Sequence, residues 1–147
     1  MEKIATIGDC YCCASGIPKY TKEHAVNIVK AAVAMIQAVK LGKEDAAFQH
    51  IQVRIGIHSC GDVTGAVMGR VKQNYDLFGP GTHVAQLMEE TGKANQIHIS
   101  NSCYNELQNT LLQNMFSPHY ETGDEVYLEK KGMKKLPTST WITTNSN

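Results

Sequence analysis

The chain has 147 residues, which is the size of about one domain and is long enough to bury a core. Fourteen Lys plus Arg balance fourteen Asp plus Glu, so no basic excess favours nucleic acid or an anionic membrane surface as a partner. With 42% hydrophobic and 19% charged residues the chain is no disordered polyelectrolyte, and its longest apolar run, residues 31–36, is far shorter than the ~20 residues of a transmembrane helix.

The first segment, residues 3–15, predicts a β-hairpin. Its residues are small, β-branched or aromatic, and Gly8-Asp9 interrupts them. Two short strands joined by a tight turn would place Asp9 at or beside the tip. Asp in such a turn commonly bonds its own backbone, which is the structural alternative. The functional alternative is a carboxylate that binds a hard cation such as magnesium together with substrate phosphates.

The next segments predict a helix and a second hairpin. Thr21 is a candidate N-cap, and apolar residues recur at three- and four-residue steps until Leu41-Gly42, where glycine ends the helix. Residues 51–57 alternate between apolar and polar side chains, and residues 63–68 form a second apolar run. Because residues 59–62 have turn chemistry, we expect these two runs to pair as a hairpin.

The second half of the chain predicts short helices and strands. A Gly-Pro-Gly break at residues 79–81 precedes a helix over residues 82–90 that stops at Gly92. A short strand follows at residues 97–99, then a helix over 101–113 and closing strands at 125–128 and 140–143. Hairpins and segregated helices predict an α+β sandwich with an antiparallel sheet.

The five cysteines predict a reducing compartment, because their number is odd and no CxxC pair or signal peptide is present. Strand alternation would place Cys10 and Cys12 on one face and Cys13 on the other. Their spacing differs from the paired knuckles of zinc sites, so we expect buried free thiols that pack as small hydrophobic side chains.

Familiar catalytic motifs are absent from the sequence. His58 and His83 have no paired carboxylate or nucleophile at a recognisable spacing, which favours structural roles. Neither GxGxxG nor GxxxxGK[ST] occurs. The basic cluster over residues 130–135 is either a solvated turn or a binding site for a triphosphate.

Several blocks, in this order, resemble the catalytic domain of class III nucleotide cyclases. They are Lys-Ile-Ala-Thr-Ile-Gly-Asp-Cys-Tyr at residues 3–11, Ser-Gly-Ile-Pro at 15–18, Val-Arg-Ile-Gly-Ile-His-Ser at 53–59, Tyr-Asp-Leu-Phe-Gly at 75–79 and Met-Glu-Glu-Thr-Gly at 88–92. The resemblance implies the cyclase variant of a ferredoxin-like α+β sandwich with an antiparallel-rich sheet. It implies one cyclase domain over residues 1–143, truncated at the N-terminus before its first strand and helix, and a frayed tail over 144–147.

The implied reaction is attack of the ribose 3′-hydroxyl of a nucleoside triphosphate on its α-phosphate. The products are the 3′,5′-cyclic monophosphate and pyrophosphate, and two divalent cations, Mg²⁺ or Mn²⁺, assist. In the family two aspartates bind these ions. Asp9 matches the second aspartate, which makes it the expected metal ligand and catalytic residue, while the block that carries the first does not occur in this sequence.

The resemblance also implies a second cyclase domain as partner. Homodimeric members carry an Asn and an Arg on the helix after the Tyr-Asp block, where this sequence has His83 and Leu87. Leucine has neither charge nor donor to stabilise a reacting phosphate. The chain therefore resembles the metal-binding half of a heterodimer or of an intramolecular pair, whose other half supplies Asn and Arg.

Further positions are expected to contact the nucleotide. Gly8 lies beside Asp9, and Ala5 and Asp76 match the positions that select the purine, although they fit neither the adenylate nor the guanylate pattern. The Leu-Phe-Gly sequence at residues 77–79 is slightly more similar to the guanylate-cyclase pattern, which slightly favours GTP. Lys131 and Lys134 are the candidate phosphate-binding lysines, whereas Asp62 stands where an Arg can face phosphate and would repel it.

These observations predict half of a nucleotide cyclase that acts on GTP or ATP. They also predict a cytoplasmic domain without nucleic-acid or direct membrane contact, whatever the membrane attachment of its parent protein. The alternative is a catalytically silent cyclase-homology module for dimerisation or regulation, favoured by Leu87, Asp62, Ala5 and the unmatched first aspartate. A generic ferredoxin-like ligand-binding domain would leave the ordered blocks unexplained.

Overall fold

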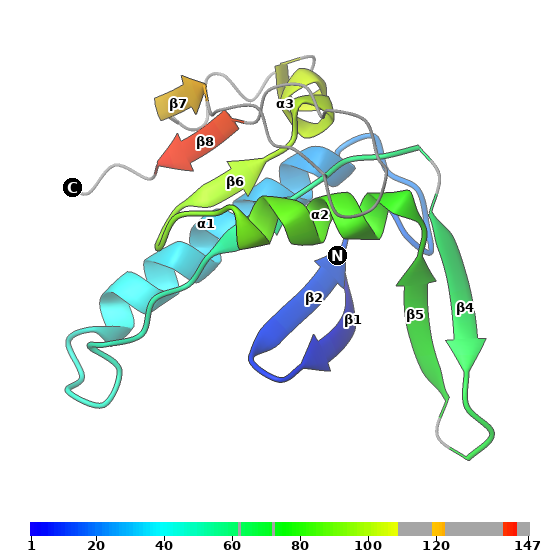
Figure 1. Ribbon diagram of the computed structural model, residues 1–147, viewed down its shortest axis with the longest axis horizontal. Coiled ribbons are helices and arrows are strands. Elements are labelled where there is room, and N and C mark those ends of the chain that lie inside the picture. Colours follow the sequence, from blue (N-terminus) through cyan, green and yellow to red (C-terminus); the bar gives the residue numbers. More distant parts are fainter. Residues whose placement is uncertain (62, 72, 109–118, 123–139, 144–147) are drawn as a thin grey trace.

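The computed structural model describes residues 1–61, 63–71, 73–108, 119–122 and 140–143 (Figure 1). Its elements, in chain order, are β1 (Glu2–Ile7), β2 (Cys10–Ala14), α1 (His24–Gly42), β3 (Ile55–Ile57), β4 (Thr64–Met68), β5 (Asn74–Phe78), α2 (Pro80–Glu90), β6 (Ile97–Ile99), α3 (Asn101–Gln108), β7 (His119–Thr122) and β8 (Thr140–Thr143).

The described strands form two hairpins and one four-stranded sheet. β1 pairs with β2, and β4 pairs with β5, both antiparallel. The larger sheet has the order β3-β6-β8-β7, in which β3 and β6 are parallel and the other pairs antiparallel. In Figure 1 both hairpins lie on one side of α2, while β6, β8 and β7 lie on the other. The expected α+β fold with an antiparallel-rich sheet is confirmed.

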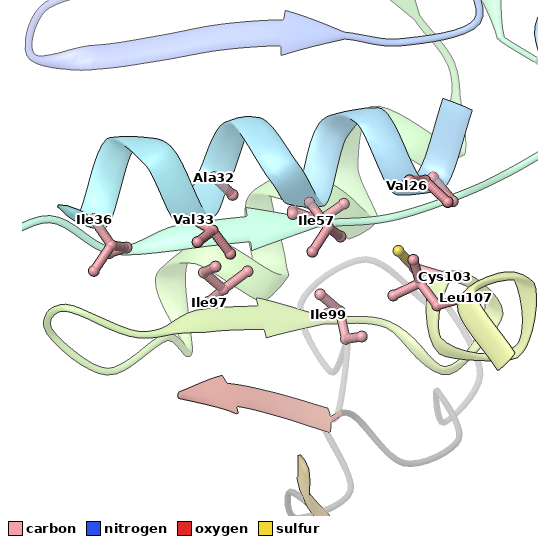
Figure 2. Packing of buried hydrophobic residues seen from close by; sticks show 11 residues of the cluster. Val26, Ala32, Val33, Ile36, Ile57, Ile97, Ile99, Cys103 and Leu107 are labelled. Carbon is pink, nitrogen blue, oxygen red and sulfur yellow. The ribbon is translucent and has the colours of Figure 1, made fainter. Parts of the chain in front are cut away.

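Helix α1 covers one face of the parallel strand pair and forms most of the core. Its buried residues recur at helical spacing, and Figure 2 shows their side chains directed at Ile57, Ile97 and Ile99. Ile36, Ile97 and Ile99 are almost fully buried, and each contributes about 1.5–3 kcal/mol by leaving water. Cys103 and Leu107 of α3 close the end of this core.

Helix α2 covers the opposite face of the same strands. Successive residues of a strand alternate between faces, so Gly56 and His98 point away from α1. A Cβ atom on Gly56 would overlap the backbone nitrogen of Glu89 and lie 2.6 Å from the carbonyl oxygen of Ala85. His98 is buried, and its Nδ1 donates to the carbonyl oxygen of Met88 at 2.7 Å. Glycine at position 56 thus permits the close approach of strand and helix.

The length and composition of α1 would also allow it to cross a membrane. This differs from the expectation drawn from the short apolar run, because small and apolar residues extend along the whole helix. In the structure the buried face of α1 packs on β3, β6 and α3, as the core helix of a globular protein does.

The predicted hairpin between residues 51–57 and 63–68 is wrong. The regular strand β3 is limited to Ile55–Ile57 and pairs with β6, whereas β4 pairs with β5 across a turn that contains Gly69 at φ 103°. Turn chemistry at residues 59–62 indicated a reversal of the chain but not the partner of either strand.

The predicted bounds of the other elements differ in smaller ways. Helix α1 begins at His24 rather than just after Thr21, whose hydroxyl accepts from the backbone nitrogen of Glu23 at 3.3 Å. Helix α2 begins two residues earlier than expected, because Pro80 fits the first helical turn. Strands β6 and β8 have the predicted bounds, and β7 was not predicted. The expected strand at 125–128 and the end of the helix over 101–113 lie outside the described residues.

Candidate active site

Asp9 lies at the exposed tip of the first hairpin. The pairing of Ile7 with Cys10 leaves Gly8 and Asp9 as a two-residue turn, and Gly8 has a φ of 61°. A positive φ at the first of two turn residues is the pattern of a type II′ turn, for which glycine is preferred. The sequence therefore fixes a carboxylate in solvent at the end of a regular two-stranded ribbon.

The strands that carry Ala5 and Asp76 lie against each other. Ala5 is a half-buried residue of β1, Asp76 is a half-buried residue of β5, and these two strands are in contact. The carboxylate of Asp76 accepts from the backbone nitrogen of Leu77 at 2.8 Å, which orients it along its own strand. The structure thus brings together the two strands that carry residues predicted to contact the nucleotide.

Helix α2 carries neither a side-chain amide nor a guanidinium group at positions 83 and 87, where an Asn and an Arg would be needed to bind phosphate. His83 is exposed, and the half-buried Leu87 offers only its carbonyl oxygen, which accepts from the backbone nitrogen of Thr91 at 3.0 Å. The candidate residues Asp62, Lys131 and Lys134 lie outside the described residues.

An ion pair joins Arg54 to Glu89 on helix α2. Arg54 donates from Nε to Glu89 Oε1 at 2.9 Å, and its Nη2 lies 2.8 Å from the same oxygen as an ion pair. The carboxylates of Glu89 and Asp9 both raise the pKa of the Cys10 thiol. The region around Cys10 therefore contains two carboxylates, of which one is paired with Arg54.

A polar network joins the end of β3 to α1 and α3. His58 Nδ1 lies 2.8 Å from the Ser100 hydroxyl and 3.2 Å from that of Ser102. The Ser59 hydroxyl donates to Glu106 Oε2 at 2.8 Å, and Nε2 of His24 lies 3.2 Å from the same oxygen. His58 thus has the structural role that its sequence context favoured. Sequence reasoning missed Glu106, although Ser102 and Glu106 stand four residues apart on one helix face.

The half-buried position of His58 predicts a pH-dependent stability. Burial lowers the pKa of His58, and the nearby Glu106 carboxylate partly opposes this by raising it. As pH falls below the ordinary histidine pKa of about 6.5, the unfolded chain binds the proton first, so stability is complete above that pH and declines below it.

Replacing His58 should therefore flatten the acid side of the stability profile. We expect His58→Asn to reduce the dependence of the unfolding free energy on pH by at most about 1.4 kcal/mol per pH unit, measured by urea unfolding between about pH 7.5 and pH 5.5. His50→Asn, at an exposed position, is the matched control. An unchanged profile in His58→Asn would contradict this assignment.

The prediction that the cysteines are buried is wrong for most of them, although all five are free thiols. Cys103 is buried, Cys12 and Cys13 are half-buried, and Cys10 and Cys60 are exposed. Burial raises the pKa of Cys103 to about 12. Partial burial also raises the pKa of Cys10, as do the neighbouring Cys12 thiol and the carboxylates of Glu89 and Asp9. For Cys10, Cys12 and Cys13 the difference arises because β2 belongs to a two-stranded hairpin rather than to a covered sheet.

Asp9 fits a divalent cation as one ligand, not as a complete site. Among the described residues no group of three or more His, Cys, Asp or Glu side chains could hold a metal ion. Magnesium is commonly bound by one or two carboxylates together with substrate phosphates and water. An exposed carboxylate on a fixed turn suits that arrangement, provided that the nucleotide or another chain supplies further ligands.

Comparisons with known proteins agree on one family. The sequence model described as the adenylate and guanylate cyclase catalytic domain matches residues 1–144. Human guanylyl cyclase C is 36% identical over 143 residues, which cover 96% of this chain and 13% of that protein. Adenylate cyclase type 9 of Gallus gallus is 32% identical over 99 residues, which cover 67% of this chain and 7% of that protein.

A solved structure shows the same relationship in three dimensions. The guanylate cyclase domain of RhGC from Catenaria anguillulae, crystallised in complex with GTP, superposes with a TM-score of 0.79 at 33% identity. The match covers 98% of this chain and 72% of that one. The chain spans 7% to 16% of the length of the curated relatives.

Proposed function

Because the chain belongs to the adenylate and guanylate cyclase catalytic domain family, we propose that it forms one half of a nucleotide cyclase. The substrate is a nucleoside triphosphate, and the products are its 3′,5′-cyclic monophosphate and pyrophosphate. The observation that carries the proposal is the exposed Asp9 carboxylate on its fixed turn, within a chain that matches the family along nearly its whole length.

In this proposal Asp9 holds the divalent cations, Mg²⁺ or Mn²⁺, at the triphosphate. Such ions, when bound, neutralise phosphate charge and make a hydroxyl a better nucleophile. The residues of this chain supply position: the left-handed Gly8 sets the direction of the turn, and the contact of β1 with β5 holds Ala5 and Asp76 on neighbouring strands. Lys131 and Lys134 remain proposed phosphate ligands.

The second half of the enzyme is proposed to be a cyclase domain with Asn and Arg at the positions of His83 and Leu87. Leu87 cannot donate a hydrogen bond from its side chain to a phosphate that gains negative charge in the transition state. A second domain with Asn and Arg at these positions would supply the hydrogen-bond donors that Leu87 lacks. The partner is either a separate chain or a second domain of the same protein.

GTP is the proposed substrate, with ATP as the alternative. Guanylyl cyclases among the relatives include a membrane enzyme of Dictyostelium discoideum, the receptor-type gcy-13 of Caenorhabditis elegans and guanylyl cyclase C, and the RhGC domain was crystallised with GTP. Relatives include cyclases named as membrane and as soluble proteins, so we propose a cytoplasmic catalytic domain without specifying the attachment of its parent.

A reconstitution experiment tests this proposal. A version of the domain that includes the strand with the family's first metal-binding aspartate is co-expressed with a cyclase domain that carries the Asn and Arg, purified as a pair, and assayed with Mn²⁺ and either GTP or ATP. We expect cyclic nucleotide from the pair, with GTP preferred, and little from either half alone. A pair that forms and binds nucleotide but makes no product would identify the silent module. The part of the chain that the structure describes contains no group of three or more potential metal ligands, which favours this alternative.

A further inference from the structure

Two thiols lie close together on the strand that follows the Gly8-Asp9 turn. The sulfur atoms of Cys10 and Cys12 are 3.7 Å apart. Both residues belong to β2 and are separated by one residue, so strand alternation places them on the same face. Their cross-strand partners on that face are Ile7 and Ala5. Cys10 is exposed and Cys12 is half-buried, so solvent reaches the pair.

The separation of the two sulfurs matches the bite of a tetrahedral metal ion. With zinc–sulfur bonds of about 2.3 Å and tetrahedral angles, two thiolate ligands lie about 3.8 Å apart. The observed 3.7 Å therefore needs almost no rearrangement of the side chains. A disulfide suits the geometry less well, because its two sulfur atoms would have to lie about 2.05 Å apart. Alternate residues of an extended strand also hold their Cα atoms about 6.7 Å apart, which is near the upper limit for a disulfide.

The charges around the pair also favour a cation. Asp9 adjoins Cys10 in the chain, and its exposed carboxylate adds negative charge beside the two thiols. Thiolates are soft ligands that select zinc and similar metals over Mg²⁺ or Mn²⁺, which prefer oxygen.

We propose that Cys10 and Cys12 are the two protein ligands of an open site for a soft divalent cation, Zn²⁺ or Cd²⁺. Each thiol releases its proton to the solvent as its sulfur bonds to the metal. Water occupies the remaining positions, because the described residues place no third His, Cys, Asp or Glu close enough to complete a site. The site is distinct from the magnesium-type role of Asp9, and it does not depend on cyclase activity.

Metal titration of the purified chain tests this site. Cd²⁺ is added and followed by the ultraviolet charge-transfer absorbance of cadmium thiolates, and Co²⁺ is used in parallel because its visible spectrum reports tetrahedral sulfur ligation. We expect one ion per chain, and at least about a tenfold weaker affinity in both Cys10→Ser and Cys12→Ser. Cys10 is exposed, so Cys10→Ser provides a folded variant even if Cys12→Ser does not.

Two other cysteines provide matched controls. Cys13→Ser changes a thiol on the opposite face of β2, and Cys60→Ser changes an exposed thiol elsewhere, so both should bind as the wild type does. Binding that persists unchanged in Cys10→Ser and Cys12→Ser, or that is lost equally in the controls, would overturn the proposal. Nucleotide is absent from the assay, so failure of the proposed cyclase function would not affect its result.

Discussion

Replacing Asp9 by Asn is expected to lower cyclic-nucleotide formation by the reconstituted pair at least about 100-fold, because the neutral amide is a poor ligand for a hard divalent cation. Asp9 is exposed at the tip of a turn, so the substitution removes charge without disturbing the core. The measurement is the initial rate with Mn²⁺ and GTP at equal pair concentration. The free energy of unfolding of the variant should stay within about 0.5 kcal/mol of that of the wild type.

Glu2→Gln is the matched control for this experiment. Glu2 is an exposed acid on the same hairpin, in β1 and at the end distant from the turn, so its loss changes net charge equally. The pair with Glu2→Gln should keep its rate. Retained activity in Asp9→Asn, or an equal loss in both variants, would show that Asp9 does not hold the ions.

The largest expected effect on stability comes from Gly56→Ala. The new methyl group would overlap the backbone of α2 at Glu89 and approach the carbonyl oxygen of Ala85. Because backbone atoms cannot rotate away, the helix must move off the sheet, and we expect a loss of about 3 kcal/mol, at the upper end for overpacking. Urea unfolding measures this free energy directly.

Gly61→Ala is the control for the glycine substitution. A Cβ atom there meets nothing within 4 Å, and the backbone is not in the left-handed region. Its unfolding free energy should stay within about 0.5 kcal/mol of the wild type. Equal stability of Gly56→Ala and Gly61→Ala would contradict the close packing of β3 on α2.

Local sequence signals predicted the elements better than their pairing. The Gly8-Asp9 hairpin, α2 and β6 follow from turn residues, proline placement and short apolar runs, all of which act within a few residues. The partner of β3 is decided by burial of Ile57 beside Ile97 and Ile99 beneath α1, and those residues are far apart in sequence. No local pattern encodes that choice, which explains the wrong hairpin.

The candidate site was predicted unevenly for the same reason. Asp9 follows from its turn and from the family resemblance, and the structure places it as expected. The spacing of Cys10 and Cys12 predicted a shared face but not their exposure, because exposure depends on whether other elements cover β2. The link from Ser59 through Glu106 to His24 joins three separate segments and could not be read from any one of them.

The most direct test of the account is a titration of this domain, expressed together with the strand that carries the first metal-binding aspartate, with its complementary half. Cyclic-nucleotide formation is measured with Mn²⁺ and GTP at a fixed concentration of the chain, while light scattering reports pair formation. The account predicts that product formation rises with the fraction of paired chain, saturates at one partner per chain and is lost in Asp9→Asn. A saturated pair that forms no more product than the partner alone would contradict it.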